Sequence, residues 1–269
     1  MTRQLPLALL LLVLTLPSTA RSRTVRHPAS AGDLAPQSML WIAAHPDDEA
    51  VAAPLLGRWC RDQHARCGFL LMTRGQQGGC LKPGGCEPDV ATVRAAEAGA
   101  ASQLFGAELF LLEYQDGGGV QPPDWRSSPG DAPDVVSRVA GIIEAFHPAI
   151  ILTFDPRHGT TCHPDHRETA AIVLDAVKLL PYDPAVYLLE SRVTFTSDPF
   201  AIHFGSAVAG ADRFDATQEW SWIVEDMQRH PSQFDGSFLT AIQQVPPIER
   251  AVWFGKAEDM LAQSAGTCP

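Results

Sequence analysis

The sequence lacks several patterns that would place it in familiar functional classes. It contains no GxGxxG segment, which leaves a dinucleotide-binding fold without support. It contains no GxSxG segment, so the nucleophile elbow of serine hydrolases is missing. It also contains no CxxC pair, although cysteine-based zinc sites usually include one. Any hydrolytic or metal chemistry is therefore to be sought among histidines and carboxylates.

Positive charge is also scarce. The chain has 20 Lys and Arg residues against 31 Asp and Glu residues, which gives a formal net charge of −11. Binding to phosphates needs a basic surface, so this balance argues against a nucleic-acid partner. The same acidity disfavours docking on anionic lipid.

Only one apolar run approaches the length of a targeting segment. Residues 5–16 are leucine-rich, follow Arg3 and precede small residues up to Ala20. The run is shorter than the roughly 20 residues of a spanning helix, so no stable membrane anchor is expected. The layout predicts a signal peptide over residues 1–20, cleaved near Ala20, and a secreted or periplasmic protein. The polar, Pro-containing residues 21–37 are expected to form a mobile lead-in.

The six cysteines fit an exported protein with disulfides. Neighbours in the sequence suggest the pairs Cys60–Cys67 and Cys80–Cys86, which leaves Cys162 and Cys268 as a long-range pair. Six cysteines allow 15 connectivities, so the sequence alone leaves the pairing open.

Strand and helix signals alternate along most of the chain. Apolar strand-like segments occupy 38–44, 67–73, 108–114, 149–155 and 185–189. Helical spacing occupies 49–64, 90–105, 133–147 and 164–180, with further helices expected near 218–229 and 248–263. This alternation predicts one domain over 38–269, a Rossmann-like three-layer αβα sandwich with a mostly parallel sheet.

Reactive side chains lie directly after four of the predicted strands: His45, Arg74, Asp116 and Asp155. In open α/β sheets the ligand binds beyond the carboxyl ends of the strands. We therefore expect these side chains to converge on one edge of the sheet.

Two short motifs combine histidine with acids. AHPDDE spans 44–49 after the first strand, and CHPDH spans 162–166 before a helix. Helix capping explains one or two acids in each motif, because carboxylates favour a helix N-terminus. Capping does not explain His163 and His166, since a protonated histidine is disfavoured there. Neutral, metal-bound histidines are compatible with that position, so the two motifs together predict a metal site.

The pair AHPDDE and HPDH resembles the PIG-L/LmbE-like family of zinc-dependent N-acetylglucosaminyl deacetylases. The segments MTRG at 72–75, R-x-x-E at 94–97 and HPSQ at 230–233 extend the likeness over roughly residues 38–233. The chain departs from the family at Gln76, where the family usually has Glu. Its cysteine-bearing insertion at 80–86 and its loop at 117–132 are also unusual, which leaves the substrate open.

The resemblance implies a Zn²⁺ ion held by His45, Asp48 and His166. It implies Asp47 as the general base. It implies that His163 either stabilises the oxyanion or protonates the leaving amine.

The resemblance also assigns residues around the metal. Arg74 and Asp116 would bind the substrate, with Arg74 holding sugar hydroxyls. Asp165 would orient a metal ligand from behind, as such outer carboxylates do. Arg94 and Glu97 would form a structural ion pair.

The predicted function is zinc-dependent hydrolysis of the N-acetyl group of an N-acetylglucosamine-type sugar or glycoconjugate. Three protein ligands leave a coordination position on zinc open for catalysis. Two alternatives remain open. One is a zinc amidase acting on another N-acyl substrate, such as an acylated glycopeptide. The other is a catalytically silent carbohydrate-binding protein of the same fold.

Overall fold

The computed structural model describes residues 34–119, 124–127, 133–266 and Cys268. The predicted signal peptide and residues 21–33 of the predicted lead-in lie outside the described residues. Across the described part of the chain, none of the helices combines the length and the apolar character needed to cross a bilayer.

A seven-stranded sheet forms the centre, in the order β3-β2-β1-β4-β5-β9-β8. Its parallel strands are β1 (Ser38–Ala43), β2 (Arg66–Thr73), β3 (Glu108–Tyr114), β4 (Ile150–Phe154) and β5 (Ala185–Leu189). The antiparallel strands β9 (Ala251–Lys256) and β8 (Asp212–Asp215) extend it at one edge. The prediction of a mostly parallel sheet is confirmed.

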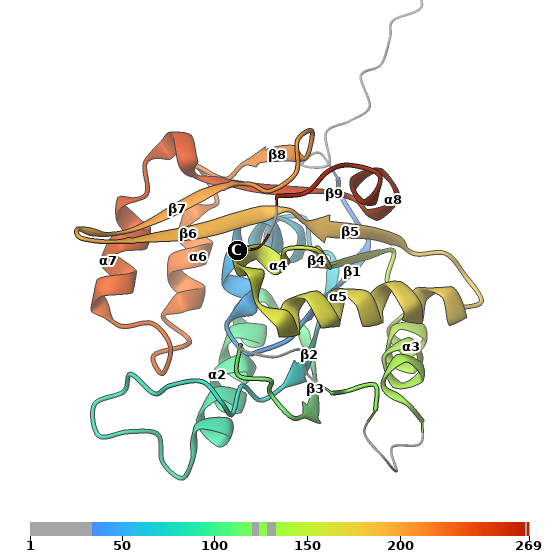
Figure 1. The fold of residues 1–269 in the computed structure, drawn as a ribbon, viewed down its shortest axis with the longest axis horizontal. Coiled ribbons are helices and arrows are strands. Elements are labelled where there is room, and N and C mark those ends of the chain that lie inside the picture. Colours follow the sequence, from blue (N-terminus) through green and yellow to red (C-terminus); the bar gives the residue numbers. More distant parts are fainter. Residues whose placement is uncertain (1–33, 120–123, 128–132, 267, 269) are drawn as a thin grey trace, which may run out of the picture.

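Helices cover both faces of this sheet (Figure 1). On β1, Met39 and Trp41 face one core while Leu40 and Ile42 face the other, as strand alternation requires. The first core is closed by α1 (Ala53–Leu56), α2 (Val90–Phe105), α6 (Trp220–Met227) and α7 (Gly236–Gln244). The second core is closed by α3 (Val135–Phe146) and α5 (Pro164–Ala176). The predicted three-layer αβα sandwich is therefore confirmed.

Local signals set the ends of the best-predicted helix. The carboxylate of Asp89 accepts the N–H of Thr92 and caps the start of α2. Gly106 ends the same helix at φ +66°, a left-handed conformation that glycine adopts without a steric penalty. Both signals can be seen in the sequence, which is why the predicted bounds 90–105 match α2.

The predicted helix over 49–64 is broken into three pieces. A 3₁₀ turn η2 (Asp48–Val51) is followed by α1 and then by a π-helical segment η3 (Gly57–Asp62). Pro54 lies in the first turn of α1, where a helix needs no N–H from it. A helix continuing from the preceding residues would need that N–H, so the helix begins anew at α1.

The predicted helix over 248–263 is wrong. This segment forms a 3₁₀ turn η5 (Pro247–Glu249), strand β9 and a short helix α8 (Ala257–Leu261). Val252, Trp253 and Phe254 favour a strand, and β9 pairs with β5 on one side and β8 on the other. These long-range pairs override the helical spacing.

One hairpin was not predicted at all. Strands β6 (Ser191–Ser197) and β7 (Phe200–Ser206) form a separate two-stranded sheet. Figure 1 shows it extending from the end of β5 across α6 and α7. Two short elements, α4 (Gly159–Cys162) and η4 (Val177–Leu179), flank α5.

The disulfides pair Cys60 with Cys67, Cys80 with Cys86 and Cys162 with Cys268. The predicted connectivity is confirmed. The third bond joins the C-terminal end of the chain to α4, beside the start of α5 (Figure 1).

Thiol titration of the denatured, unreduced protein should detect no free thiol, because all six cysteines are bonded. The same sample should give six thiols after reduction. Two or more free thiols per chain before reduction would contradict the pairing.

Gly57→Ala should destabilise the fold, because an added Cβ would lie 2.2 Å from the ring of Trp222. Overpacking of this kind lowers the free energy of unfolding by about 1–3 kcal/mol. Gly99→Ala in α2 is the matched control, since nothing lies within 4 Å of its added Cβ. That variant should gain about 0.5–1 kcal/mol from helix propensity. Urea denaturation would measure the free energy of unfolding of both variants, and equal changes in that free energy would contradict the packing argument.

Candidate metal and catalytic site

The first motif forms a tight turn directly after β1. Asp47 has φ +96°, an uncommon backbone conformation for a non-glycine residue. This turn folds Asp48 back onto the strand end, where its Oδ2 accepts the N–H groups of Ala44 at 3.0 Å and His45 at 2.8 Å. The Asp48 carboxylate is therefore held in a fixed orientation.

The second motif follows β4. His163 caps α5, and its Nδ1 accepts the N–H of Asp165 at 3.2 Å. His166 lies in the first turn of α5, and its Nδ1 donates to the carbonyl of Gly159 at 3.0 Å. Its ring stacks on Phe154 with the centroids 4.2 Å apart. A carbonyl oxygen only accepts, so the Nε2 of neutral His166 is left with a lone pair.

The two motifs meet because β1 and β4 are neighbours in the sheet. The Nε2 of His166 lies 2.9 Å from Oδ1 of Asp48, and the Nδ1 of His45 lies 3.6 Å from Oδ2 of Asp48. One ring nitrogen from each of His45, His163 and His166 lies within 4.8 Å of the other two. All three predicted metal ligands therefore come together, with His163 beside them.

Outer partners fix the ring of His45. Its Nε2 lies 3.1 Å from Oδ2 of Asp165 and 3.5 Å from Oδ1 of Asp116. The same Asp165 oxygen accepts the N–H of Gly117 at 2.8 Å. A carboxylate at this position takes the Nε2 hydrogen and leaves Nδ1 of His45 to face Asp48.

These residues fit a zinc ion. Zinc–ligand bonds of about 2.0–2.2 Å in a tetrahedron place the ligand atoms about 3.3 Å apart. The Nε2 of His166 lies 2.9 Å from Oδ1 of Asp48 and the Nδ1 of His45 lies 3.6 Å from Oδ2, so both rings approach the carboxylate at about this spacing, each at a different oxygen. The lone pairs of His45 Nδ1 and His166 Nε2 both face the Asp48 carboxylate, which is the donor set that zinc takes.

The charges also favour a cation. Burial would lower the pKa of His45, but the carboxylates of Asp48, Asp116 and Asp165 raise it well above its ordinary value. Burial would raise the pKa of Asp48, but His166 and His45 hold it well below its ordinary value. The site thus stabilises positive charge at its centre.

Asp47 and Asp48 are adjacent but face different partners. Oδ1 of Asp47 lies 2.9 Å from Nη2 of Arg94, while Asp48 faces the two histidines. Burial raises the pKa of Asp47 to about 6 against the opposing charge of Arg94. A carboxylate with a pKa near working pH suits proton transfer.

His163 is kept neutral by its surroundings. Burial, followed by the charges of His166 and His45, lowers its pKa to about 4. Its Nδ1 already accepts a hydrogen bond, so the neutral ring carries its hydrogen on Nε2. An added Cβ at Gly119 would lie 2.9 Å from that Nε2, so only glycine leaves it room.

A polar cavity of about 290 Å³ lies over these groups. Its described lining consists of His45, Asp47, Asp48, Gln77, Gly78, Arg94, Asp116, Gly118, His163, His166 and Gln233. Arg74 does not belong to this lining, because its guanidinium pairs with Glu113 at the surface. Asp155 faces Arg157, with 2.9 Å between its Oδ2 and the Nε of Arg157.

The expected ion pair between Arg94 and Glu97 is wrong. Arg94 binds Asp47 and donates to the carbonyls of Gly75 and Pro46. Glu97 instead accepts the N–H of Ser232 at 3.1 Å and its hydroxyl at 2.5 Å. The two residues lie one helical turn apart on α2, but Arg94 contacts the loops after β1 and β2 whereas Glu97 contacts Ser232.

The buried pair Glu49 and His230 lies next to Asp47, and the sequence did not predict it as part of the site. Glu49 accepts the N–H of Asp47 at 3.2 Å and lies 2.7 Å from Nε2 of His230. Burial would lower the pKa of His230, but the Glu49 carboxylate raises it to about 9. Asp226 lies in the same cluster. Two signals in the sequence pointed here: the HPSQ segment, which contains His230, and the AHPDDE motif, which ends at Glu49.

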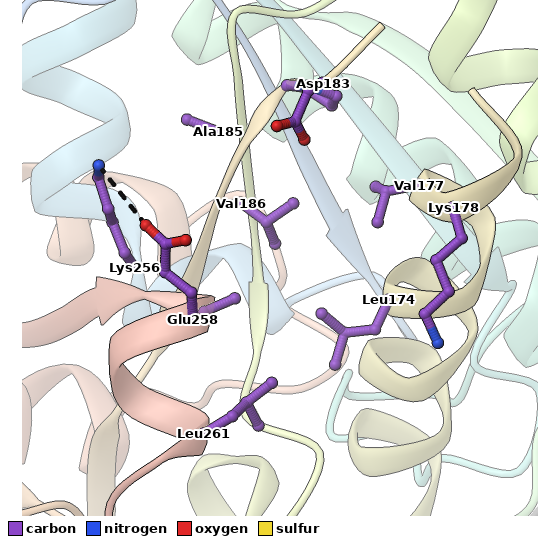
Figure 2. A pocket seen from close by; sticks show the side chains of 11 residues that line it. Leu174, Val177, Lys178, Asp183, Ala185, Val186, Lys256, Glu258 and Leu261 are labelled. Atoms are coloured by element: carbon purple, nitrogen blue, oxygen red, sulfur yellow. Dashed lines mark ion pairs between the residues drawn. The ribbon is translucent and has the colours of Figure 1, made fainter. Parts of the chain in front are cut away.

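A larger cavity of about 520 Å³ lies elsewhere, between α5, β5 and α8 (Figure 2). Leu174, Val177 and Val186 line it, and Lys256 pairs with Glu258 at 3.9 Å on its rim. Its described lining contains none of the predicted site residues, so size alone does not identify the reactive site.

Comparisons with known proteins agree with this geometry. The PIG-L family model, GlcNAc-PI de-N-acetylase, matches residues 40–177. The chain is 29% identical over 154 residues to the 1D-myo-inositol 2-acetamido-2-deoxy-alpha-D-glucopyranoside deacetylase of Kineococcus radiotolerans. That alignment covers 49% of this chain and 42% of the relative, so this chain spans less than half of that relative's length.

Solved structures share the fold at low identity. The N,N'-diacetylchitobiose deacetylase of Pyrococcus horikoshii superposes with a TM-score of 0.58 at 17% identity, covering 82% of this chain and 84% of that one. The 4-carboxy-2-hydroxymuconate hydratase of Pseudomonas putida superposes with a TM-score of 0.59 at 15% identity, covering 82% and 96%. The fold thus hosts more than one reaction. Because the matched region spans just over half of the sequence and contains both histidine motifs, the chain belongs to the PIG-L family of GlcNAc-PI de-N-acetylases.

Proposed function

We propose that this protein is a zinc-dependent hydrolase that removes the acetyl group from the nitrogen of an N-acetylglucosamine-type sugar or glycoconjugate. The convergence of His45, Asp48 and His166 beside Asp47 and His163 carries the proposal. Both deacetylases named above act on acetylated amino sugars according to their names, which supports the same substrate class here.

His45, Asp48 and His166 would hold the zinc ion. When bound, zinc would supply Lewis acidity that polarises the amide carbonyl and makes a water easier to deprotonate. Asp47 takes the proton of the attacking water. Arg94 holds the Asp47 carboxylate in place, and the positive φ of Asp47 turns it away from the metal ligands.

His163 acts on the carbonyl oxygen. As a neutral ring with hydrogen on Nε2, it donates a hydrogen bond to the oxygen as negative charge develops there. Asp116 belongs to the cavity lining and can accept sugar hydroxyls, while Asp165 orients His45. Arg74, paired with Glu113 outside the lining, would reach only parts of a substrate that extend beyond the cavity.

The same geometry disfavours a silent carbohydrate-binding protein. Such a protein has no need for a half-buried, strained Asp47 aimed at Arg94 beside a complete ligand set. We also propose that the protein is exported. The three disulfides and the predicted signal peptide support export, because disulfides persist in oxidising compartments.

His166→Ala should lose bound zinc, because it removes one ligand and leaves the Asp48 carboxylate without the nearer of its two histidine rings. The matched control is His203→Ala, a half-exposed histidine on β7 that pairs with Glu249. Elemental analysis after dialysis should give about one zinc per chain in the wild type and the control. Full zinc content in His166→Ala would refute the ligand assignment.

The adjacent acids should separate metal binding from catalysis. Asp47→Asn should retain zinc and lose about 10²–10⁴-fold in turnover, because an amide does not accept the proton from water. Asp48→Asn should weaken zinc binding, because it replaces a charged ligand with a neutral one. Zinc titration and acetate release, measured on both variants, test this. If Asp47→Asn loses zinc while Asp48→Asn keeps it, the two roles are reversed.

A further inference from the structure

A second cavity of about 150 Å³ adjoins the catalytic groups. It shares Asp47, Asp48 and His166 with the polar cavity. The rest of its wall is mainly apolar and includes Val193, Phe195, Ile202, Phe204, Phe234 and Phe238. Four of these six residues come from the β6–β7 hairpin, and Phe238 comes from α7.

The apolar wall is built from packed aromatic rings. Phe238 contacts Phe195, Phe200 and Phe234 with ring centroids 6.2, 5.0 and 5.6 Å apart. Val193, Ile202 and Phe204 are buried, whereas Phe195 is 53% exposed. Ligand pockets are lined mainly by apolar and aromatic side chains, as this cavity is.

The position of the cavity indicates which part of a substrate enters it. An N-acyl sugar has a polar side, the sugar, and a less polar side, the acyl group, joined at the amide. With the sugar in the polar cavity and the acyl carbon at Asp48 and His166, the acyl group extends toward the apolar cavity. Asp47, Asp48 and His166 line both cavities, so the apolar cavity lies directly beside the groups that would hold the zinc ion and the attacking water.

The volume exceeds what an acetyl group needs. At about 30 Å³ for a group the size of a water molecule, the cavity accommodates about five such groups. The single methyl of an acetyl group would leave most of this apolar wall uncovered.

We propose that the apolar cavity binds the acyl chain and that this protein hydrolyses N-acyl amino sugars with medium-length chains, about four to six carbons. The inference rests on the proposed function and specifies its substrate class. In the reaction, water adds to the carbonyl carbon and the C–N bond breaks. The nitrogen takes a proton, which gives a medium-chain carboxylate and a free amino sugar.

The test measures release of free amine from N-acetyl-, N-butanoyl-, N-hexanoyl- and N-octanoylglucosamine by the zinc-loaded protein. Each methylene buried in the cavity should raise kcat/KM up to about fourfold, the factor that corresponds to about 0.8 kcal/mol. We expect hexanoyl to exceed acetyl by at least tenfold in kcat/KM. A ratio of one or less would overturn the inference.

Substitutions in the β6–β7 hairpin test whether the apolar cavity sets the preference for longer acyl chains. Ile202→Trp fills the cavity and should lower the hexanoyl-to-acetyl ratio at least tenfold. Phe195→Ser, at the exposed edge, should lower it severalfold without disturbing a buried position. Thr194→Trp is the matched control, because Thr194 is an exposed neighbour on β6 outside the cavity lining, and its ratio should not change. An unchanged ratio in both Ile202→Trp and Phe195→Ser would overturn the assignment.

Two further results separate the inference from the proposed function. If no acyl glucosamine is hydrolysed, acetyl included, the proposed function itself fails. If acetyl is released efficiently and longer chains are not, the function stands and the inference fails. A rate gain with octyl N-acetylglucosaminide in place of the longer acyl chains would assign the cavity to an aglycone and overturn the acyl assignment.

Discussion

The carboxylate of Asp48 is the group around which the catalytic edge of the sheet is organised. It is buried, it accepts two backbone N–H groups at the end of β1, and it faces His166 from the neighbouring strand's loop. A buried carboxylate is unfavourable unless charge and hydrogen bonds compensate for its lost hydration. The turn at Asp47 brings the carboxylate to the N–H groups of Ala44 and His45, and the rings of His45 and His166 supply the opposing charge.

Arg94 connects that centre to the rest of the fold. From the first turns of α2 it reaches Asp47 and the carbonyl oxygens of Pro46 and Gly75, so one guanidinium joins the loops after β1 and β2. Gly75 has φ +64°, and an added Cβ there would lie 2.3 Å from Nη1 of Arg94. This explains in physical terms why a glycine follows Arg74. The carboxylate of Glu49 accepts the N–H of Asp47, and His230 in turn contacts that carboxylate.

The fold and the chemistry are separable. A hydratase and a deacetylase superpose on this chain with almost equal TM-scores, so the sheet and its helices provide a frame rather than a reaction. The β6–β7 hairpin and α7 lie outside the region matched by the family model and build the apolar wall beside the candidate metal ligands. In our proposal, substrate choice therefore depends on a part of the chain outside the region that the family model matches.

The sequence by itself determined the five parallel strands, the helices α2, α3, α5 and α6, and the motifs that carry His45, Asp48 and His166. These features follow from local periodicity, capping residues and the rule that reactive groups gather at strand ends, all of which act over short stretches of chain. Tertiary structure decided the rest. Strand β9 overrides its helical spacing because β5 and β8 supply its hydrogen bonds. Arg94 binds Asp47 rather than Glu97, and His230 meets Glu49, because contacts between loops distant in sequence are set by packing that no local pattern encodes.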